Sequence, residues 1–395
     1  MTFTEIIETE EKYGANNYKP LDVVLEKGKG VWVEDIEGKK YLDCLAAYSA
    51  VNQGHCHPHI YDAMVEQAKK ITLTSRAFRN DKLPLLYKKL NEMTGYEMFL
   101  PMNSGAEAVE SAIKAVRKWA YKVKGIENDK AEIIVANDNF HGRTLSIVSF
   151  SSEEQYKDGF GPFTPGFHLV KFGDIEEIKS KINKNTAGIM IEPIQGEAGI
   201  IIPPDGYLKQ IREICDEHNI AFICDEIQSG LGRSGKLFAY EYDNIRPDIV
   251  IIGKALSGGF YPVSAVLSSK EYLGVFNPGD HGSTFGGNPL GAAVAIAALE
   301  VLENEKLVEN SFNLGEYFVS ELRKLSNPII KDIRSRGLWI GLELTENARP
   351  YCEKLMELGV LCKDTHHTII RVAPPLVITK DEIDWALERF RKVLV

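Results

Sequence analysis

Short apolar runs alternate with segments of helical spacing through the middle of the chain. In Gly206–His218, Leu208, Ile211, Ile214 and Cys215 fall on one helical face. Such alternation is typical of an α/β fold with a mostly parallel sheet covered by helices. A second helix is expected at Ser104–Val123, and buried strands at Glu132–Ala136, Ala187–Glu192, Ala221–Cys224, Asp248–Ile252 and Pro262–Leu267.

The pattern changes after an Ala-rich helix expected at about Pro289–Glu303. Gly30–Asp43 resembles a β-hairpin that turns at Glu37-Gly38, and we expect it to pack on the C-terminal part. That part is expected to hold strands within Ile333–Leu344 and at Thr368–Val372, and helices at Pro350–Leu358 and Lys380–Leu394. We therefore expect a large domain over residues 48–290. A smaller α+β domain would combine the N-terminal segment 1–47 with residues 291–395, entered through the long linking helix.

Composition and charge narrow the class of protein. The formal net charge is −10, which argues against a general nucleic-acid binder, because phosphate binding needs a basic face. No apolar run approaches the roughly 18 residues that a membrane span needs. The six cysteines are scattered without a CxxC pair, which argues against a structural zinc site and fits a reducing compartment. The acidic N-terminus resembles neither a signal peptide nor a transit peptide, so we expect a cytoplasmic protein without metal.

An acid and a lysine follow two of the predicted strands. Asp225 comes directly after Ala221–Cys224, and Lys254 follows Asp248–Ile252 after one glycine. In a parallel sheet, ligands gather beyond the carboxyl ends of the strands. A buried lysine has its charged form disfavoured, which helps it form an imine with an aldehyde. A carboxylate can keep the ring nitrogen of a pyridine cofactor protonated, and Gln228 could bond a ring hydroxyl. A Lys–Asp salt bridge without chemistry fits these residues equally well.

Two glycine-containing segments could hold a phosphate. Ser104 is a good N-cap, and Gly105 lets an anion approach the free N–H groups of the helix that follows. Gly282–Asn288 combines two hydroxyls with several glycines. An ordinary capped helix and an ordinary loop explain the two segments as well.

Phe140-His141-Gly142-Arg143 follows the strand at Glu132–Ala136. Phe140 could stack on a cofactor ring, and Arg143 could grip a carboxylate with two hydrogen bonds. A lone arginine is more often simply a surface residue.

Two further motifs are better explained as structural. Gly230–Gly235 matches GxGxxG, but Asp225–Ser229 separates it from the strand and no clear helix follows, so dinucleotide binding is disfavoured. His55-Cys56-His57-Pro58-His59 resembles a metal motif, but Pro58 favours a helix start there, with the helix over His59–Ile71.

Taken together, the motifs resemble those of the class III, or ω-, aminotransferases among the fold-type I pyridoxal-phosphate enzymes, and most of all the branch that acts on ornithine. The resemblance runs over nearly the whole chain. It is carried by Tyr13–Tyr18, Ala50–Pro58, Met102–Glu107, Tyr156–Pro162, Ile191–Gly199, Asp225–Gln228, Gly253–Gly259, His281–Pro289 and Ile370–Pro375.

The resemblance implies a role for each matching residue. Lys254 would hold pyridoxal 5'-phosphate as a Schiff base and then move the proton, and Asp225 would pair with the ring nitrogen. Gln228 would face the ring oxygen and Phe140 would stack on the ring, while His141 stands beside it where some relatives carry Trp. The phosphate would be bound by Ser104, Gly105 and Ala106, with Ser283 and Thr284 arriving from a partner subunit, which implies at least a homodimer.

The resemblance also implies two carboxylate substrates, L-ornithine and 2-oxoglutarate. Glu197 would neutralise Arg371 while ornithine presents its terminal amine, and would release Arg371 when 2-oxoglutarate arrives. Substrate choice would depend on Tyr18, Tyr48, Arg143, Glu197 and Arg371.

Three rival functions stay open from the sequence. The chain could prefer N-acetylornithine, 4-aminobutyrate or another ω-amine. A pyridoxal-phosphate aminomutase or racemase would not need 2-oxoglutarate, and the Glu197–Arg371 pair argues against it. A nucleotide-binding protein that uses Gly230–Gly235 is disfavoured by the strand context.

Overall fold

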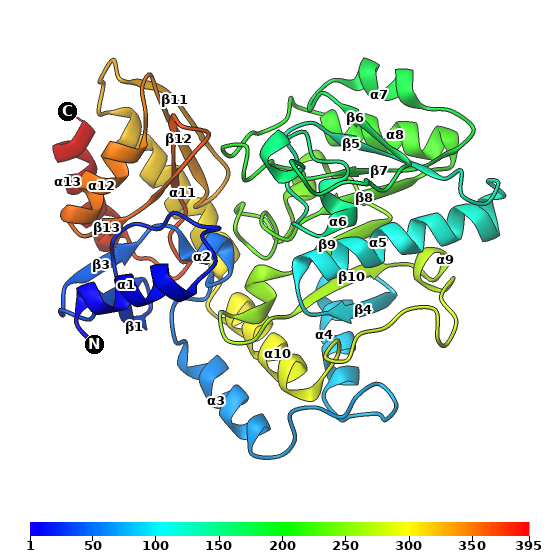
Figure 1. Cartoon of the computed structure of the whole chain (residues 1–395), viewed down its shortest axis with the longest axis horizontal. Helices are drawn as coiled ribbons and strands as arrows, with labels where there is room; N and C mark the ends of the chain where they lie inside the picture. The colour runs from blue at the N-terminus through cyan, green and yellow to red at the C-terminus, as the bar shows by residue number, and fades with distance from the viewer. Residues whose placement is uncertain (395) are drawn as a thin grey trace.

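A seven-stranded sheet lies at the centre of the larger lobe in the computed structural model, which describes residues 1–394 (Figure 1). In spatial order its strands are β4 (Met98–Met102), β10 (Ser264–Ser268), β9 (Ile249–Ile252), β8 (Ala221–Asp225), β7 (Thr186–Ile191), β5 (Glu132–Ala136) and β6 (Phe167–Val170). The strands from β9 to β6 pair in parallel, whereas β10 is antiparallel to both β9 and β4. The mostly parallel sheet that the sequence predicts is therefore confirmed.

Alternate residues of the central strands face opposite layers of helices. Val250 and Ile252 of β9 belong to the apolar cluster that contains residues of α8 (Tyr207–His218). Ile249 and Ile251 belong to the cluster that contains residues of α5 (Gly105–Trp119). Because both faces are covered, these strands are apolar at every position instead of alternating with polar residues.

Other helices complete the larger lobe, and α10 packs against α3 and α4. They are α3 (Pro58–Ala68), α4 (Leu83–Thr94), α6 (Leu145–Val148), α7 (Ile175–Lys181), α9 (Lys270–Leu273) and α10 (Pro289–Asn304). Shorter or irregular helical turns occupy Ala120–Lys124, Glu154–Tyr156, Ala239–Asp243 and Lys254–Ser257. The helix expected at Ser104–Val123 thus has a regular part, α5, and a π-helical last turn.

The smaller lobe joins the two ends of the chain, as Figure 1 shows by the blue and orange segments that lie side by side. Its first sheet is β1 (Leu25–Lys29), β2 (Trp32–Asp35), β3 (Lys40–Asp43) and β13 (Val360–Leu361), in that order. The parallel pairing of β3 with β13 confirms that the N-terminal hairpin packs on the C-terminal part. The second sheet is β11 (Ile330–Ser335), β12 (Ile340–Leu344), β15 (Ile369–Val372) and β14 (Lys363–Thr365). Its helices are α11 (Leu307–Arg323), α12 (Arg349–Glu357) and α13 (Lys380–Leu394).

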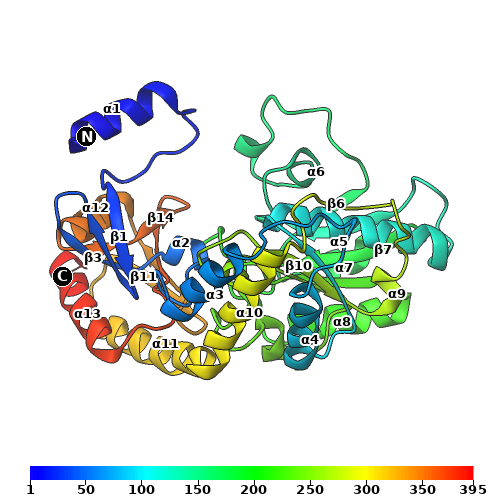
Figure 2. The ribbon, with the colours of Figure 1, turned by 90° about the horizontal axis from the view of Figure 1, so that it is seen from below.

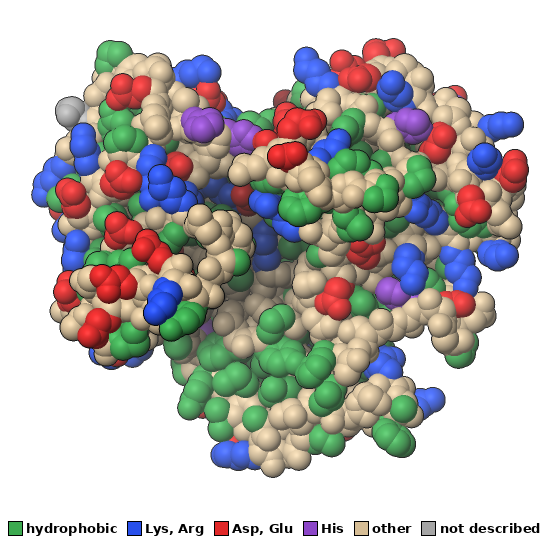
Figure 3. All heavy atoms as spheres, in the orientation of Figure 1, with side chains coloured by type: hydrophobic (Ala, Val, Ile, Leu, Met, Phe, Trp, Pro, Cys, Tyr) green, Lys and Arg blue, Asp and Glu red, His purple; other side chains and the backbone are tan. Residues whose placement is uncertain are grey.

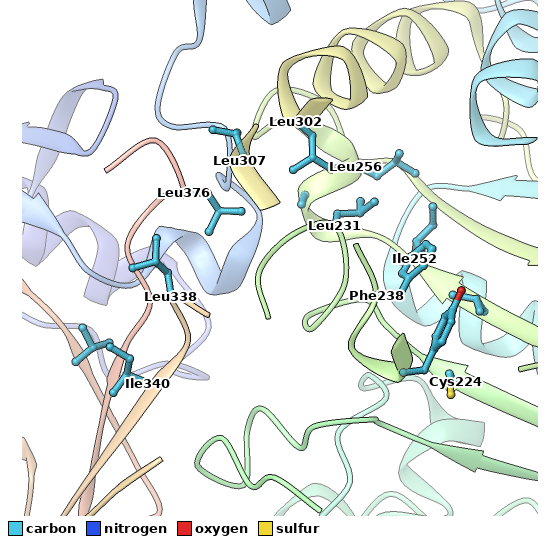
Figure 4. Packing of buried hydrophobic residues seen from close by; sticks show 14 of the residues in the cluster. Cys224, Leu231, Phe238, Ile252, Leu256, Leu302, Leu307, Leu338, Ile340 and Leu376 are labelled. Carbon is cyan, nitrogen blue, oxygen red and sulfur yellow. The ribbon is translucent and has the colours of Figure 1, made fainter. Parts of the chain in front are cut away.

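One apolar cluster continues from the larger lobe into the smaller one. Figure 4 shows Leu231, Leu256 and Leu302 on one side, with Leu338, Ile340 and Leu376 on the other. All six side chains are buried. The two lobes therefore share a core, while the domain limits at residues 47/48 and 290/291 stay predictions.

The N-terminal helix α1 (Phe3–Tyr13) was not expected from the sequence. None of its residues is buried, and Figure 2 shows it standing away from the rest of the chain. A capping box at Thr2 and Glu5 accounts for its start. Among the described residues, no helix combines the length and apolarity that crossing a membrane requires.

Candidate active site

A cavity opens at the carboxyl edge of the central sheet, where three neighbouring strands end. Glu192 follows β7, Asp225 ends β8, and Lys254 follows β9. The cavity volume is about 190 Å³, which suits a ring-sized molecule, since a cavity of about 150 Å³ accepts benzene. Its walls are formed by Gly105, Ala106, Phe140, His141, Gly142, Glu192, Ile194, Glu197, Asp225, Ile227, Gln228, Ser229 and Lys254.

Asp225 is buried and held by two donors. His141 Nδ1 lies 2.6 Å from one carboxylate oxygen, and the backbone N–H of Ile227 donates to the other at 3.1 Å. Burial acts to lower the pKa of His141, but the hydrogen bond and charge of Asp225 outweigh it and raise that pKa above its usual range. The carboxylate is therefore fixed in orientation at the cavity wall, as a partner for a positively charged ring nitrogen must be.

Lys254 has neither an ion pair nor a hydrogen bond from its side chain within residues 1–394, so the salt bridge to Asp225 that the sequence left open is absent there. Burial lowers the pKa of its amine to about 8, against the raising effect of Glu197. Its backbone has φ +40°, a conformation that costs a non-glycine residue energy and that recurs at active sites. An unpaired amine whose charged form is disfavoured by burial is suited to react with an aldehyde.

The N-terminus of α5 forms the anion-binding end of the cavity. Ser104 and Glu107 make a capping box, and the N–H groups of Gly105 and Ala106 lie in the first turn at the cavity wall. A Cβ on Gly105 would lie 3.0 Å from Ile227 Cδ1, so glycine keeps the backbone close to the cavity. Free N–H groups and the helix dipole suit a phosphate there.

Ser283 and Thr284 do not line this cavity. Ser283 Oγ accepts a hydrogen bond at 2.8 Å from Nδ2 of Asn103 in the same chain. Asn103 directly precedes Ser104, the N-cap of α5. The expected arrival of Ser283 and Thr284 at a site from a partner subunit stays a prediction.

Glu197, Gln228 and Arg371 form a closed hydrogen-bonded ring beside Lys254. Arg371 lies 2.7 Å from Glu197 and donates to Gln228 Oε1 at 3.1 Å, and Gln228 Nε2 donates to Glu197 at 3.2 Å. Burial acts to raise the pKa of Glu197, but the charges of Arg371 and Lys254 and the hydrogen bonds lower it to about 2. The carboxylate is therefore charged at neutral pH and neutralises Arg371.

Aromatic side chains surround the two arginines expected at the substrate. The Arg143 guanidinium lies 3.6 Å from the ring centre of Tyr156 and 5.5 Å from that of Phe140. The Arg371 guanidinium lies 5.1 Å from the ring centre of Tyr48. None of Arg143, Tyr48, Arg371 and Tyr18 lines the cavity itself, but Arg143 lies near Phe140 of the wall and Arg371 bonds Glu197 and Gln228 of the wall. Tyr18 is 82% exposed. Burial and the charges of Glu197 and Tyr18 act to raise the pKa of Tyr48, and the roles of these four residues at the substrate stay predictions.

Glu192 is the one acidic wall residue for which the sequence analysis named no role. It accepts hydrogen bonds from the N–H groups of Phe140 at 2.9 Å and Gly196 at 3.4 Å. Burial raises its pKa to about 7. The rule that identified Asp225, an acid at the end of a buried strand, applies to Glu192 as well and could have identified it.

Tyr48 is presented by a left-handed turn of four residues without glycine, labelled α2 (Ala46–Ser49). Their φ angles are 49°, 45°, 58° and 75°. A left-handed conformation costs a residue with a side chain roughly 1–2 kcal/mol. Strain of this kind persists where the surrounding structure holds it, often at a binding site.

Relief of this strain at the exposed Ala47 is expected to stabilise the fold. Ala47→Gly should raise the free energy of unfolding by about 0.5–1 kcal/mol, because the relief exceeds glycine's extra freedom in the unfolded chain. Ala50, with φ −79°, is the matched control, and Ala50→Gly should be destabilising by a similar amount. Denaturant unfolding of both variants measures the difference. Equal losses in the two would show that the turn is not strained.

The wall residues fit pyridoxal 5'-phosphate in three separate places. An unpaired amine is available at Lys254, a fixed carboxylate at Asp225, and free N–H groups at the start of α5. The Gly230–Gly235 segment, by comparison, forms turns that no helix follows directly. The three histidines near Pro58 bond to separate carboxylates, Asp43, Glu305 and Glu300.

A family model and a curated relative both match this chain and indicate the same family. Residues 13–394 match the family described as aminotransferase class-III. The chain is 62% identical to an ornithine aminotransferase of Geobacillus sp. strain WCH70 over 390 residues, which are 99% of this chain and 98% of the relative.

Two solved structures are similar over the whole chain. One is an ornithine aminotransferase from Toxoplasma gondii with partial occupancy of pyridoxal phosphate at its active site (TM-score 0.98, 44% identity, 100% of this chain and 94% of that one). Another is an acetylornithine aminotransferase from Elizabethkingia anophelis (TM-score 0.91, 47% identity, 100% and 99% covered). The chain therefore belongs to the class-III aminotransferases and has their fold-type I architecture.

Proposed function

We propose that this chain transfers the terminal amino group of L-ornithine to 2-oxoglutarate, with pyridoxal 5'-phosphate as cofactor, giving glutamate 5-semialdehyde and glutamate. The observation that carries the proposal is the ring of Glu197, Gln228 and Arg371 next to the unpaired Lys254. A cavity that can neutralise its own arginine suits two carboxylate substrates that bind in different ways. The high identity to an ornithine aminotransferase supports the same reaction.

The cofactor, when bound, supplies an aldehyde for the amine and a ring that accepts electrons from the substrate carbon. Lys254 would hold it covalently and, once released, would hold and move the substrate proton at its Nζ atom. Asp225, whose oxygens are fixed by His141 and Ile227, would keep the ring nitrogen protonated. Gly105 and Ala106 offer their N–H groups to the phosphate, and Phe140 lies at the cavity wall as a stacking surface.

The two substrates must bind in one pocket with their α-carboxylates in different places. Ornithine presents its terminal amine, so its carboxylate lies far from the ring, where Arg143 stands near Tyr156 at the exposed side. The closed Glu197–Arg371 pair then offers no free cation near the ring. 2-Oxoglutarate needs a cation close to the ring for its α-carboxylate, and Arg371 fills that role when Glu197 moves away.

The proposal also includes an oligomeric state and a cellular compartment. We propose a homodimer with shared sites, which the exposed aromatic side chains of Tyr61, Phe78 and Phe285 support. Figure 3 shows apolar side chains gathered on the lower part of this face, in the region where Figure 1 places α10. Six free cysteines, five of them buried, support a reducing compartment such as the cytoplasm.

A donor assay tests the reaction. Purified protein with added cofactor should release glutamate 5-semialdehyde from ornithine only while 2-oxoglutarate is present. The cofactor's visible band should bleach with ornithine alone and return with 2-oxoglutarate. Faster turnover of N-acetylornithine or 4-aminobutyrate would favour another ω-amine donor, a choice that the similarity to an acetylornithine aminotransferase makes worth testing. Product formation without 2-oxoglutarate would point to an aminomutase.

Glu197→Ala is expected to change the choice of donor. Loss of the carboxylate leaves Arg371 free in both half-reactions, which favours donors that place an α-carboxylate near the ring. The ratio of kcat/KM for ornithine to that for glutamate should fall by about 10²-fold, because a buried charge pair is worth a few kcal/mol. Glu343→Ala is the control, since Glu343 pairs with Arg334 and Lys331 and does not line the cavity. An unchanged ratio in Glu197→Ala would contradict the switch.

A further inference from the structure

We propose that Arg233 is a positioning residue that clamps the ends of β12 and β15 and thereby holds Arg371 in place for the second substrate. It lies in the Gly230–Gly235 segment, a motif that the proposed function does not use. The inference deepens the proposed function and rests on it where it concerns 2-oxoglutarate.

The Arg233 side chain bonds three segments at once. One guanidinium nitrogen donates to the carbonyl oxygens of Leu338 and Pro374, each at 2.7 Å. The other terminal nitrogen donates to Asn52 Oδ1 at 2.6 Å. Asn52 is itself fixed, because it donates to the Leu231 carbonyl at 3.2 Å and its own backbone carbonyl accepts from Leu376 N–H at 2.7 Å.

These acceptors stand at one end of a strand pair. Leu338 lies just before β12, and Pro374 lies just after β15. The two strands are antiparallel with Ile340 opposite Val372, so both carbonyls are at the same end. Arg371 belongs to β15, three positions before Pro374. Fixing this end of the pair therefore fixes the backbone that carries Arg371.

The glycines of the segment permit a close contact between the lobes. A Cβ on Gly337 would lie 2.5 Å from the backbone nitrogen of Gly235, and a Cβ on Gly315 would lie 2.2 Å from the backbone of Gly337. Ser311 Oγ donates to the Arg233 carbonyl at 3.0 Å and accepts from Leu338 N–H at 3.1 Å. In Figure 4, Leu231 lies on the side of the larger lobe and Leu338 on the side of the smaller lobe. The GxGxxG pattern thus serves backbone packing between the lobes.

Arg233 makes no ion pair within residues 1–394, although it is fully buried. Burial lowers the pKa of its guanidinium to about 9, and the nearby Arg371 acts in the same direction. An apolar side chain of similar volume would avoid this desolvation penalty. The planar fork of arginine can meet several acceptors in fixed directions, and that geometry accounts for a buried cation here.

The test is Arg233→Lys in the full protein with cofactor. Lysine keeps the charge but presents a single nitrogen and loses the fork. The KM for 2-oxoglutarate should rise about tenfold, since a small displacement of a binding group can cost up to 10²-fold. The KM for ornithine should change less than about twofold, because Arg371 stays paired with Glu197 in that half-reaction. Hydrogen exchange at the amides of β12 and β15 should be faster, with or without cofactor.

Arg212→Lys is the matched control, because Arg212 lies on α8 and pairs with Asp216 and Asp248, away from β15. It should change neither the KM for 2-oxoglutarate nor exchange in β12 and β15. If Arg233→Lys does not fold, Asn52→Ala removes one acceptor and should raise the same KM about threefold. Equal changes in both KM values, or unchanged exchange, would overturn the clamp. A wild-type protein that does not use ornithine would instead refute the proposed function, and the exchange result would still decide the clamp.

Discussion

Lys254→Ala is expected to remove transamination, lowering kcat by about 10⁴-fold or more. The substitution removes both the amine that binds the cofactor covalently and the group that moves the proton, and proton transfer by a positioned side chain alone contributes about 10²–10⁴-fold. Borohydride reduction of the loaded wild type followed by peptide mass analysis should place the cofactor on Lys254. Lys270, which is exposed at the start of α9, is the control, and Lys270→Ala should keep full activity.

The pH dependence of covalent cofactor attachment gives a second test of Lys254. Burial lowers the pKa of Lys254 to about 8, so the reactive neutral amine increases as the pH rises through that value. The rate of covalent attachment to the cofactor-free protein should rise correspondingly between about pH 7 and 9. A rate that still rises steeply near pH 10 would mean that the amine has its ordinary pKa. Activity retained in Lys254→Ala would refute the assignment altogether.

The sheet was predictable because its strands are apolar on both faces. Segments such as Ala221–Asp225 and Ile249–Ile252 contain buried residues at every position, and a run of this kind is visible without any tertiary information. The residues at the ends of those runs were predictable for the same reason, since topology alone places Asp225 and Lys254 at one edge. Their surroundings were not predictable: His141 bonds Asp225, whereas Lys254 has no side-chain partner within residues 1–394.

Contacts between distant segments account for most of what the sequence missed. The bond between His141 and Asp225 joins residues 84 positions apart, and no local pattern indicates it. The clamp at Arg233 depends on carbonyl groups of Leu338 and Pro374, and backbone acceptors carry no side-chain signature. The helix α1 contributes no buried residue to the core, so the search for core-facing apolar patterns did not include it. The left-handed turn at Ala46–Ser49 contains no glycine that would have marked it.

Asp225→Asn is expected to leave the fold intact and to slow both half-reactions. The amide has the shape of the carboxylate but no negative charge, so it cannot keep a ring nitrogen protonated or stabilise charge that develops on the ring. Removal of a preorganised electrostatic partner of this kind typically costs about 10²–10³-fold in kcat. Rapid mixing with ornithine and, separately, with 2-oxoglutarate should show a similar loss in each half-reaction, because both need the same electron acceptance.

The form of the loss separates an electrostatic role of Asp225 from a merely structural one. An electrostatic partner lowers kcat with little change in KM, and its replacement by a neutral amide shifts the pH dependence of the cofactor's absorption band. Asp248→Asn is the matched control: Asp248 accepts from Phe222 N–H and pairs with Arg212 just before β9, at the opposite end of that strand from Lys254. That variant should melt at a lower temperature and keep the band and kcat. If Asp225→Asn did the same, the carboxylate would be holding the fold, and another group would have to act on the ring nitrogen.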